Sequence, residues 1–266
     1  MKEPLVSIIT PSFNHGRFIE RTIVSVKEQE YPRVEHIVID GGSTDNTAEI
    51  LKAYGDHVRW VCEPDRGTSD ALNKGFVRSR GDIIGWVNSD DTYEPGAIGR
   101  VVSCFAENPE VDVIYGGCNK IDEDDNRIGK SKVEEFSLVK LINNRNYIAA
   151  PAVFFKRYAF EEVGMFDVNL EFCMDYDLWI RMGQIFRLER VPYVLANIRK
   201  HSSAKTHALG NRQKVRQEVL LMTKRHGRHM LAPLYRRYVR SRVREAISIK
   251  RLFKKALHLN VGLFRS

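Results

Sequence analysis

Short apolar runs alternate with amphipathic segments along the first half of the chain. Apolar runs rich in β-branched residues predict buried strands, over residues 5–10, 34–39, 58–63, 82–87 and 111–117. Apolar residues at helical spacing between these runs predict helices, over residues 16–29, within 40–55, over 68–79 and over 92–108. Pro95 suits the first turn of the last helix. This alternation predicts an α/β fold with a mostly parallel sheet and helices on both faces.

Polar and acidic residues follow the predicted strands at one edge of the sheet. They are the segment PSFN after the first strand, Asp40 after the second, Glu63 and Asp65 after the third, and NSDD after the fourth. Ligands of such sheets bind at the carboxyl ends of the strands. A bound cation is the simplest balance for clustered carboxylates, and Mg²⁺ or Mn²⁺ takes carboxylate and phosphate oxygens. The sequence therefore predicts a metal–phosphate clamp at NSDD, with helix capping as the alternative.

The phosphate compound is narrowed by the patterns that the sequence lacks. The first loop, PSFNHG, has no G-x-G-x-x-G pattern for a dinucleotide, and the chain has no G-x-x-x-x-G-K-[ST] pattern of a P-loop. Asp40 is suited to accept hydroxyl or N–H groups of a nucleoside. We therefore expect a nucleotide-diphosphate donor held by carboxylates and a divalent ion.

Five segments, in order and spacing, resemble the family 2 glycosyltransferases with a GT-A fold. They are VSIITPSFNHGRFIERTIVSVKEQ, VIDGGSTDNT, DRGTSDALNKG, GDIIGWVNSDDTYEPGA and MDYDLWIRM, and the resemblance covers roughly residues 5–205. It implies an inverting, metal-dependent transfer of a sugar from a nucleotide-diphosphate sugar. The nucleotide-binding residues that it implies are Pro11 and Phe13 in the pocket wall, Asp40 at the base, Asp70 near the nucleotide, and Asn88 and Asp90 at the outer positions of the D-x-D motif.

The metal ligands follow from a departure from this motif. Asn88 stands where the family's first Asp would be, and an amide oxygen is a weaker ligand for a hard cation. We therefore expect Mn²⁺ or Mg²⁺ on Asp90 and Asp91. His201 is a candidate third ligand, because comparable segments of the family carry a His near the metal or diphosphate. The alternative diphosphate contacts are Arg199 and Lys200.

Asp175 is the candidate general base. An acceptor hydroxyl must lose its proton as it attacks the sugar, and a nearby carboxylate can take that proton. Asp175 precedes apolar residues at helical spacing in CMDYDLWIRMG, so it lies at a predicted helix start, where the helix dipole favours an anion. The family motif supports the assignment, although relatives often have Glu-Asp where this chain has Met174-Asp175. Helix capping is the alternative role for Asp175 and Asp177.

Charge divides the chain into an acidic body and a basic C-terminal segment. Residues 205–266 contain 17 of the 42 Lys and Arg residues and only 2 of the 34 Asp and Glu residues. We expect a GT-A catalytic domain over residues 1–204 and a basic helical extension over 205–266. Within the catalytic domain, we expect a nucleotide-binding part over about 1–117 and an acceptor part over about 118–204. The segment CNKIDEDDNRIGKS predicts a hairpin with a charged turn.

The extension also predicts a membrane contact. Over residues 233–264, apolar residues recur every three or four positions and Lys and Arg occupy the other faces, as in an interfacial helix on an anionic membrane. The alternative is that this face packs on the body or on a second subunit, giving a homodimer. No apolar run approaches the ~20 residues of a membrane span, and the start lacks a signal peptide. We expect a cytoplasmic protein, peripheral on the inner face of the membrane.

The sequence thus predicts a non-processive glycosyltransferase, since neither a Q-x-x-R-W motif nor membrane helices are visible. A UDP-sugar is favoured as donor, with GDP and dTDP left open, and the acceptor is a glycan or a lipid-linked molecule in polysaccharide or glycolipid assembly. The alternatives are a nucleotidyltransferase, a glycoside hydrolase, or a nucleic-acid-binding protein acting through the basic tail. We expect no nucleic-acid partner, because the acidic body repels a polyanion.

Overall fold

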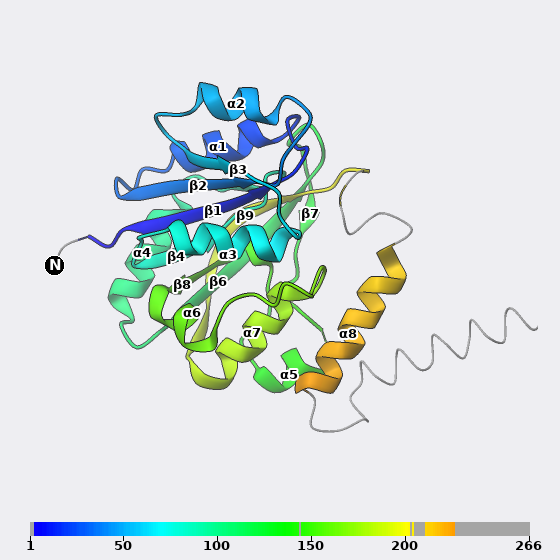
Figure 1. The fold of residues 1–266 in the computed structure, drawn as a ribbon. Helices are drawn as coiled ribbons and strands as arrows, with labels where there is room; N and C mark the ends of the chain where they lie inside the picture. Colours follow the sequence, from blue (N-terminus) through cyan, green and yellow to red (C-terminus); the bar gives the residue numbers. More distant parts are fainter. Residues whose placement is uncertain (1–2, 144, 203, 205–210, 227–266) are drawn as a thin grey trace, which may run out of the picture.

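The computed structural model describes residues 3–143, 145–202, 204 and 211–226. They form a nine-stranded mixed sheet in the order β3-β2-β1-β4-β8-β6-β9-β5, with β7 paired to β6 (Figure 1). The strands are β1 Val6–Ser12, β2 Val34–Asp40, β3 Arg59–Cys62, β4 Ile83–Trp86, β5 Thr92–Tyr93, β6 Val113–Ile121, β7 Arg127–Lys130, β8 Val153–Lys156 and β9 Leu188–Arg199. The α-helices are α1 Ile19–Lys27, α2 Thr47–Ala53, α3 Thr68–Arg78, α4 Ala97–Glu107, α5 Leu138–Asn143, α6 Arg157–Val163, α7 Met174–Ile185 and α8 Arg212–His226.

Strands β1 to β4 form the parallel part of the sheet, as the sequence predicts. β1 pairs in parallel with β2 and β4, and β2 pairs in parallel with β3. Their register places Ser12 opposite Asp40 and Asp40 opposite Cys62. The carboxyl ends of these strands therefore meet at one edge, and the polar segments that follow them start from neighbouring positions.

The second half of the sheet is mixed, which the sequence pattern did not predict. β8 lies between β4 and β6 and runs antiparallel to both. The strand expected over 111–117 is therefore not the next parallel neighbour of β4. β8 can occupy the centre of the sheet because its apolar side chains serve both faces: Phe154 packs in one core cluster and Phe155 in the other. The predicted hairpin is confirmed by the antiparallel pair β6–β7.

The helix expected over 92–108 begins later than predicted. Thr92 and Tyr93 instead form β5, which pairs with β9. Gly96 follows with a φ of 70°, a left-handed conformation that glycine adopts without steric cost, and α4 starts at Ala97. Pro95 thus lies before the helix rather than in its first turn, because sheet pairing takes the residues ahead of it.

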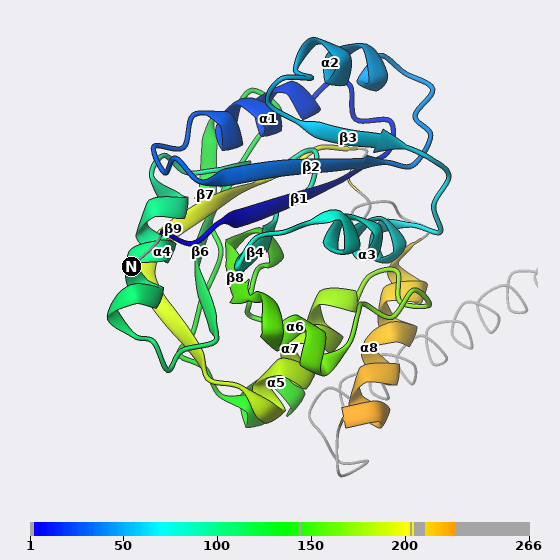
Figure 2. The same cartoon turned by 60° about the vertical axis from the view of Figure 1, so that its left-hand side comes forward.

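Helices cover both faces of the sheet, as predicted (Figures 1 and 2). Successive residues of a strand point to opposite faces, so Ile8 packs with α1 and α4 while Ile9 packs with α3, α6 and α7. On the second face, the Trp86 ring at the end of β4 stacks on Trp179 of α7, with 5.3 Å between ring centroids. This contact fixes α7 beside the carboxyl end of β4.

The packed body extends beyond the boundary expected at residue 204. α8 lies against α7 and α5 (Figures 1 and 2). Its Met222 is 1% exposed and belongs to the same core cluster as Trp179. The expected division at 117/118 falls inside β6, so the two proposed parts share one sheet. Residues 233–264 lie outside the described residues, and among the helices that are described none is long and apolar enough to span a membrane.

Candidate active site

The loops that follow β1 and β2 hold each other at the carboxyl-end edge. Asn14, with a φ of 53°, donates its backbone N–H to Ser43 Oγ over 2.7 Å and accepts the Thr44 N–H over 2.8 Å. Asn adopts the left-handed conformation more readily than most residues. Gly16 N–H adds a 2.8 Å bond to the Asp45 carboxylate. Each loop therefore shapes the other.

Asp40 is fully buried at the end of β2, and its carboxylate organises the loop after it. It accepts the N–H groups of Gly42 and Ser43 over 3.2 and 2.9 Å, and the Ser43 hydroxyl over 2.5 Å. The Cys62 thiol donates to the same carboxylate over 3.1 Å. In the structure Asp40 thus holds the loop in place, and its contact with a nucleotide base stays a prediction.

The remaining predicted nucleotide-binding residues lie along the same edge. Pro11 is buried within β1, whereas Phe13, just beyond the strand, has an exposed ring with 58% of its surface accessible. Although burial opposes it, the Arg66 N–H and the Lys74 ammonium lower the pKa of Asp70 at the start of α3. Burial raises the pKa of Asp65, and the negative charges of Asp70 and Asp40 add to this rise. The acidic groups therefore converge as the sequence predicts.

The adjacent carboxylates of Asp90 and Asp91 have opposite environments. Asp91 is 3% exposed, and its two oxygens accept the Arg199 N–H over 2.9 Å and the Asn88 side-chain amide over 3.0 Å. Burial, together with the charge of Asp90, raises the pKa of Asp91. Although burial opposes it, the hydrogen bond with His201 keeps the pKa of Asp90 below its usual value. Asp91 ties the loop to β9, and Asp90 is the ionised member of the pair.

His201 lies beside Asp90, and its role as a metal ligand stays a prediction. Its Nε2 is 3.0 Å from Asp90 Oδ2, and its ring packs on Phe18 with 4.7 Å between centroids. His15, which the sequence analysis did not single out, bonds through Nδ1 to Ser89 Oγ over 2.6 Å. Its position one residue after PSFN was the available signal. Among the residues that the structure describes, no three or more His, Cys, Asp or Glu side chains are grouped to hold a metal.

Arg199, an alternative diphosphate contact in the sequence analysis, has a buried guanidinium that other protein groups engage. It is 2% exposed, and its guanidinium donates to the Asp90 carbonyl over 2.8 Å, to the Asp122 carbonyl over 2.9 Å and to the Asp125 carboxylate over 2.6 Å. These bonds fasten the β6–β7 hairpin to the 88–91 loop. The side chain therefore has a structural role in this arrangement.

Asp175 lies in the first turn of α7, as predicted. Its Oδ2 accepts the Asn146 side-chain amide over 3.0 Å, and its Oδ1 accepts the Tyr176 N–H over 2.7 Å. Burial raises the pKa of Asp175 to about 6, against the two hydrogen bonds, which favour the anion. A carboxylate that titrates near neutrality is suited to general base catalysis. No pattern in the sequence pointed to Asn146.

Asp177 has a different partner set from Asp175. It is buried and accepts Arg181 Nε over 2.7 Å and Arg225 over 3.0 Å, and His226 Nε2 lies 2.8 Å away. Although burial opposes it, these partners lower the pKa of Asp177. Asp177 thus links α7 to the end of α8.

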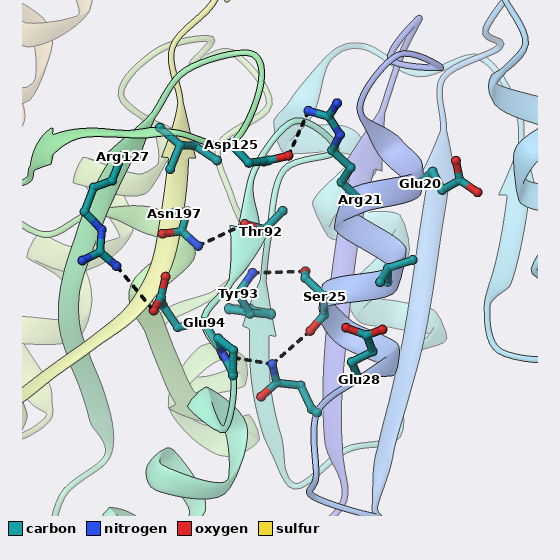
Figure 3. A pocket seen from close by; sticks show the side chains of 14 residues that line it. Glu20, Arg21, Ser25, Glu28, Thr92, Tyr93, Glu94, Asp125, Arg127 and Asn197 are labelled. Carbon is teal, nitrogen blue, oxygen red and sulfur yellow. Dashed lines mark hydrogen bonds and ion pairs between the residues drawn. The ribbon is translucent and has the colours of Figure 1, made fainter.

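A groove of about 800 Å³ lies apart from these residues, between α1, β5 and the β6–β7 hairpin (Figure 3). Ion pairs cross its walls, between Arg21 and Asp125 over 3.0 Å and between Arg127 and Glu94 over 3.9 Å. Its lining includes none of the residues predicted for the nucleotide, the metal or the base. We therefore place the candidate site at the carboxyl-end edge rather than in this groove.

The fold is of the GT-A type. Residues 7–164 match the family model of glycosyl transferase family 2, and the chain belongs to that family. An uncharacterized glycosyltransferase of Rickettsia typhi is 30% identical over 221 residues, which cover 78% of this chain and 68% of that protein. Enzymes of this family transfer a sugar from a nucleotide-sugar donor, and this class replaces the alternatives left open by the sequence.

Two solved structures share the fold at low sequence identity. The mannosyltransferase PcManGT of Pyrobaculum calidifontis, in complex with GDP-Man and Mn²⁺, superposes with a TM-score of 0.66 at 18% identity, covering 100% of this chain and 82% of that one. S. aureus TarS 1–349 in complex with UDP-GlcNAc gives a TM-score of 0.66 at 15% identity, covering 88% of this chain and 71% of that one. At these identities the likeness concerns the fold.

Proposed function

We propose that this chain is a metal-dependent, inverting and non-processive glycosyltransferase that moves one sugar from a UDP-sugar to an acceptor hydroxyl. The observation that carries the proposal is Asp175, a carboxylate held by two N–H donors whose pKa lies near 6. Trp179, one helical turn after Asp175, stacks on Trp86 at the end of β4, the strand that leads into the loop with Asp90, and this contact supports the proposal. A single base across from a nucleotide-diphosphate site suits direct displacement with inversion.

The proposed metal ligands are Asp90 and His201. A carboxylate and an imidazole 3.0 Å apart are a suitable donor pair for Mn²⁺ or Mg²⁺, which commonly fills its remaining positions with phosphate oxygens and water. Asp91 is left out of this set because both of its oxygens are engaged inside the protein. When bound, the metal would neutralise the charge that develops on the leaving nucleoside diphosphate.

The nucleotide would lie over the edge formed by the loops after β1 and β2. Phe13 offers an exposed ring for stacking on a base or ribose. The loops that Asp40 and Asn14 hold would supply backbone N–H and hydroxyl contacts. Asp175, from the other side, would take the proton of the acceptor hydroxyl.

A donor screen tests this proposal. Thermal stability is measured with UDP, GDP and dTDP, with and without Mn²⁺, followed by release of nucleoside diphosphate from UDP-GlcNAc, UDP-Glc and GDP-Man. We expect stabilisation by a nucleoside diphosphate only when metal is present, and release that depends on Asp90. Stabilisation by RNA alone, or release unaffected by chelator, would contradict the proposal. The His201→Ala variant should bind Mn²⁺ about tenfold more weakly, and an unchanged metal titration would remove His201 from the ligand set.

We also propose that residues 233–264 bring the enzyme to an anionic membrane that carries a lipid-linked acceptor. The packing of α8 decides how this is tested, since a chain ending near residue 205 would lose part of the body. The matched comparison is the full chain and a chain ending at His226, co-sedimented with phosphatidylserine vesicles. Equal binding of both chains would contradict docking through the tail, and a concentration-dependent mass of the full chain alone would favour a homodimer.

A further inference from the structure

A carboxylate in the basic segment holds the turn that leads into the helix with the proposed base. Glu218 is one of 2 acidic residues among residues 205–266. From α8, its Oε1 accepts the Glu171 N–H over 2.8 Å, and its Oε2 accepts the N–H groups of Phe172 and Cys173 over 2.7 and 2.8 Å. Backbone donors at a helix start have no partner within the helix, and the cap residue Cys173 supplies no side-chain bond. Glu218 therefore satisfies the N–H of the cap residue Cys173 and holds the turn that leads into α7.

The segment that Glu218 holds is bound on its other side by α3. The Asn73 side chain donates to the Phe166 carbonyl and accepts the Phe166 N–H, each over 3.0 Å, and Ser69 Oγ donates to the Leu170 carbonyl over 2.8 Å. Residues 164–173 thus run between α3 and α8 (Figure 2). With α3 fixed on the sheet, the α8 side of this clamp sets where α7 begins.

We propose that Glu218 is a positioning residue for Asp175, acting through the turn 171–173 that it holds. Asp175 follows Cys173 by two residues, so a displacement of this turn moves the carboxylate directly. A base displaced by ~1 Å can lose about 10²-fold in rate. The inference rests on the proposed role of Asp175 as the base, and it makes α8 a part of the active-site support.

The groups around Asp175 act on its ionisation in opposite directions. Asn146 donates a hydrogen bond that favours the carboxylate, whereas the negative charge of Glu218 on α8 disfavours it. Cys173 and Tyr176 also face Asp175, and burial raises the pKa of both well above neutrality, so they are uncharged there. Removing the Asn146 donor and removing the Glu218 charge should therefore shift the ionisation of Asp175 in opposite senses.

The test compares Glu218→Gln and Asn146→Ala with a matched control. Glu35→Gln removes a partly buried carboxylate that also bridges elements, by accepting the Arg80 N–H and the Ser7 hydroxyl, but at the amino-terminal edge of the sheet. All chains are assayed for donor turnover as a function of pH and for backbone hydrogen exchange at residues 171–173. The exchange measurement needs no substrate and therefore stands apart from the proposed function.

For Glu218→Gln we expect about tenfold faster backbone exchange at residues 171–173. The kcat at high pH, where the profile is flat (the plateau), should be about tenfold lower. The acid limb, meaning the fall of turnover at low pH, should have its midpoint about half a pH unit lower. Asn146→Ala should move the acid limb up by about one unit, and Glu35→Gln should leave it in place. Glu218→Asp keeps the negative charge on a side chain that is one methylene shorter. It should therefore lower the plateau kcat while leaving the midpoint of the acid limb at its wild-type pH.

The outcomes distinguish the proposed role of Asp175 from the proposed role of Glu218. A pH profile that ignores Asn146→Ala would overturn Asp175 as the base, and with it this inference. A profile that responds to Asn146→Ala but not to Glu218→Gln, with unchanged exchange at 171–173, would overturn the role of Glu218 alone. If Glu218→Gln does not fold, a Glu218→Asp chain with wild-type plateau and wild-type exchange gives the same contradiction.

Discussion

The proposed donor half, residues 3–91, and the proposed base region, residues 145–226, build their polar sites in different ways. In the donor half, polar residues follow neighbouring parallel strands and bond to loops that start at adjacent positions, as Asn14 does with Ser43 and Thr44. In the base region, Asp175 depends on Asn146 from one segment, while its turn depends on Glu218 from α8. One site follows from strand order, and the other from long-range packing.

Because of this difference, mutations should be able to change nucleotide binding and the function of Asp175 independently. A substitution at the end of a strand in the donor half should weaken nucleotide binding without disturbing Asp175. A change in α8 or in the segment before α7 should act on the base while leaving nucleotide binding intact.

Asp90→Asn should have the largest effect. Loss of the ionised carboxylate beside His201 should lower turnover by about 10³-fold and remove metal-dependent nucleotide binding, because the developing charge is no longer neutralised. Turnover with saturating Mn²⁺ and isothermal titration of UDP measure this. Near-normal turnover would mean that the clamp lies elsewhere.

Asp175→Asn should lower kcat by about 10²-fold with little change in donor affinity, since the base acts on the acceptor. The expected acid limb near pH 6 in the wild-type profile should disappear with it, because the group with a pKa of about 6 is gone. Steady-state kinetics between about pH 5 and about pH 8 give both quantities. A defect confined to donor binding would mean that Asp175 acts on the donor, and the two regions would then not be functionally separate.

Asp91→Asn should behave unlike Asp90→Asn despite being its neighbour. Asn retains an acceptor for the Arg199 N–H, and the amide of Asn88 can turn to meet the new donor, so we expect a stability loss of about 1 kcal/mol. Metal affinity and most of the turnover should remain. Metal titration and urea unfolding measure the two properties, and lost metal affinity would restore Asp91 as a ligand.

His36 gives the smallest expected effect, within the core of the donor half. It is buried against Thr10 Oγ1 at 2.9 Å, and burial lowers its pKa from 6.5 to about 3. Because the unfolded chain takes up the proton first, the stability present above pH 6.5 is lost as the pH falls towards 3. Replacing His36 with Gln removes this proton uptake. Between pH 7 and about 5.5, urea unfolding should show about 1 kcal/mol less loss in His36→Gln than in wild type, and equal losses would assign the acid sensitivity to other groups.

Much of the donor half could be predicted from the sequence, whereas little of the support for the base could. Apolar runs and turn residues gave β1 to β4, and parallel order then brought Asp40, Asp65 and Asp90 to one edge. The start of α7 at Asp175 also followed from local pattern. Asn146 and Glu218 carry no local signal of this kind, although an acidic residue in a segment with only 2 of them was a usable hint.

The strand and helix alternation, the acidic edge and the family follow from the amino-acid sequence alone. They depend on neighbours in the chain and on ordered motifs. Three other features are known only from the tertiary structure. β8 enters the sheet between β4 and β6, and α8 belongs to the body. Asp91 accepts a hydrogen bond from β9, while Asp90 lies beside His201. Each of these outcomes depends on which buried surfaces and backbone donors find partners far along the chain, and burial and pairing of that kind are properties of the folded whole.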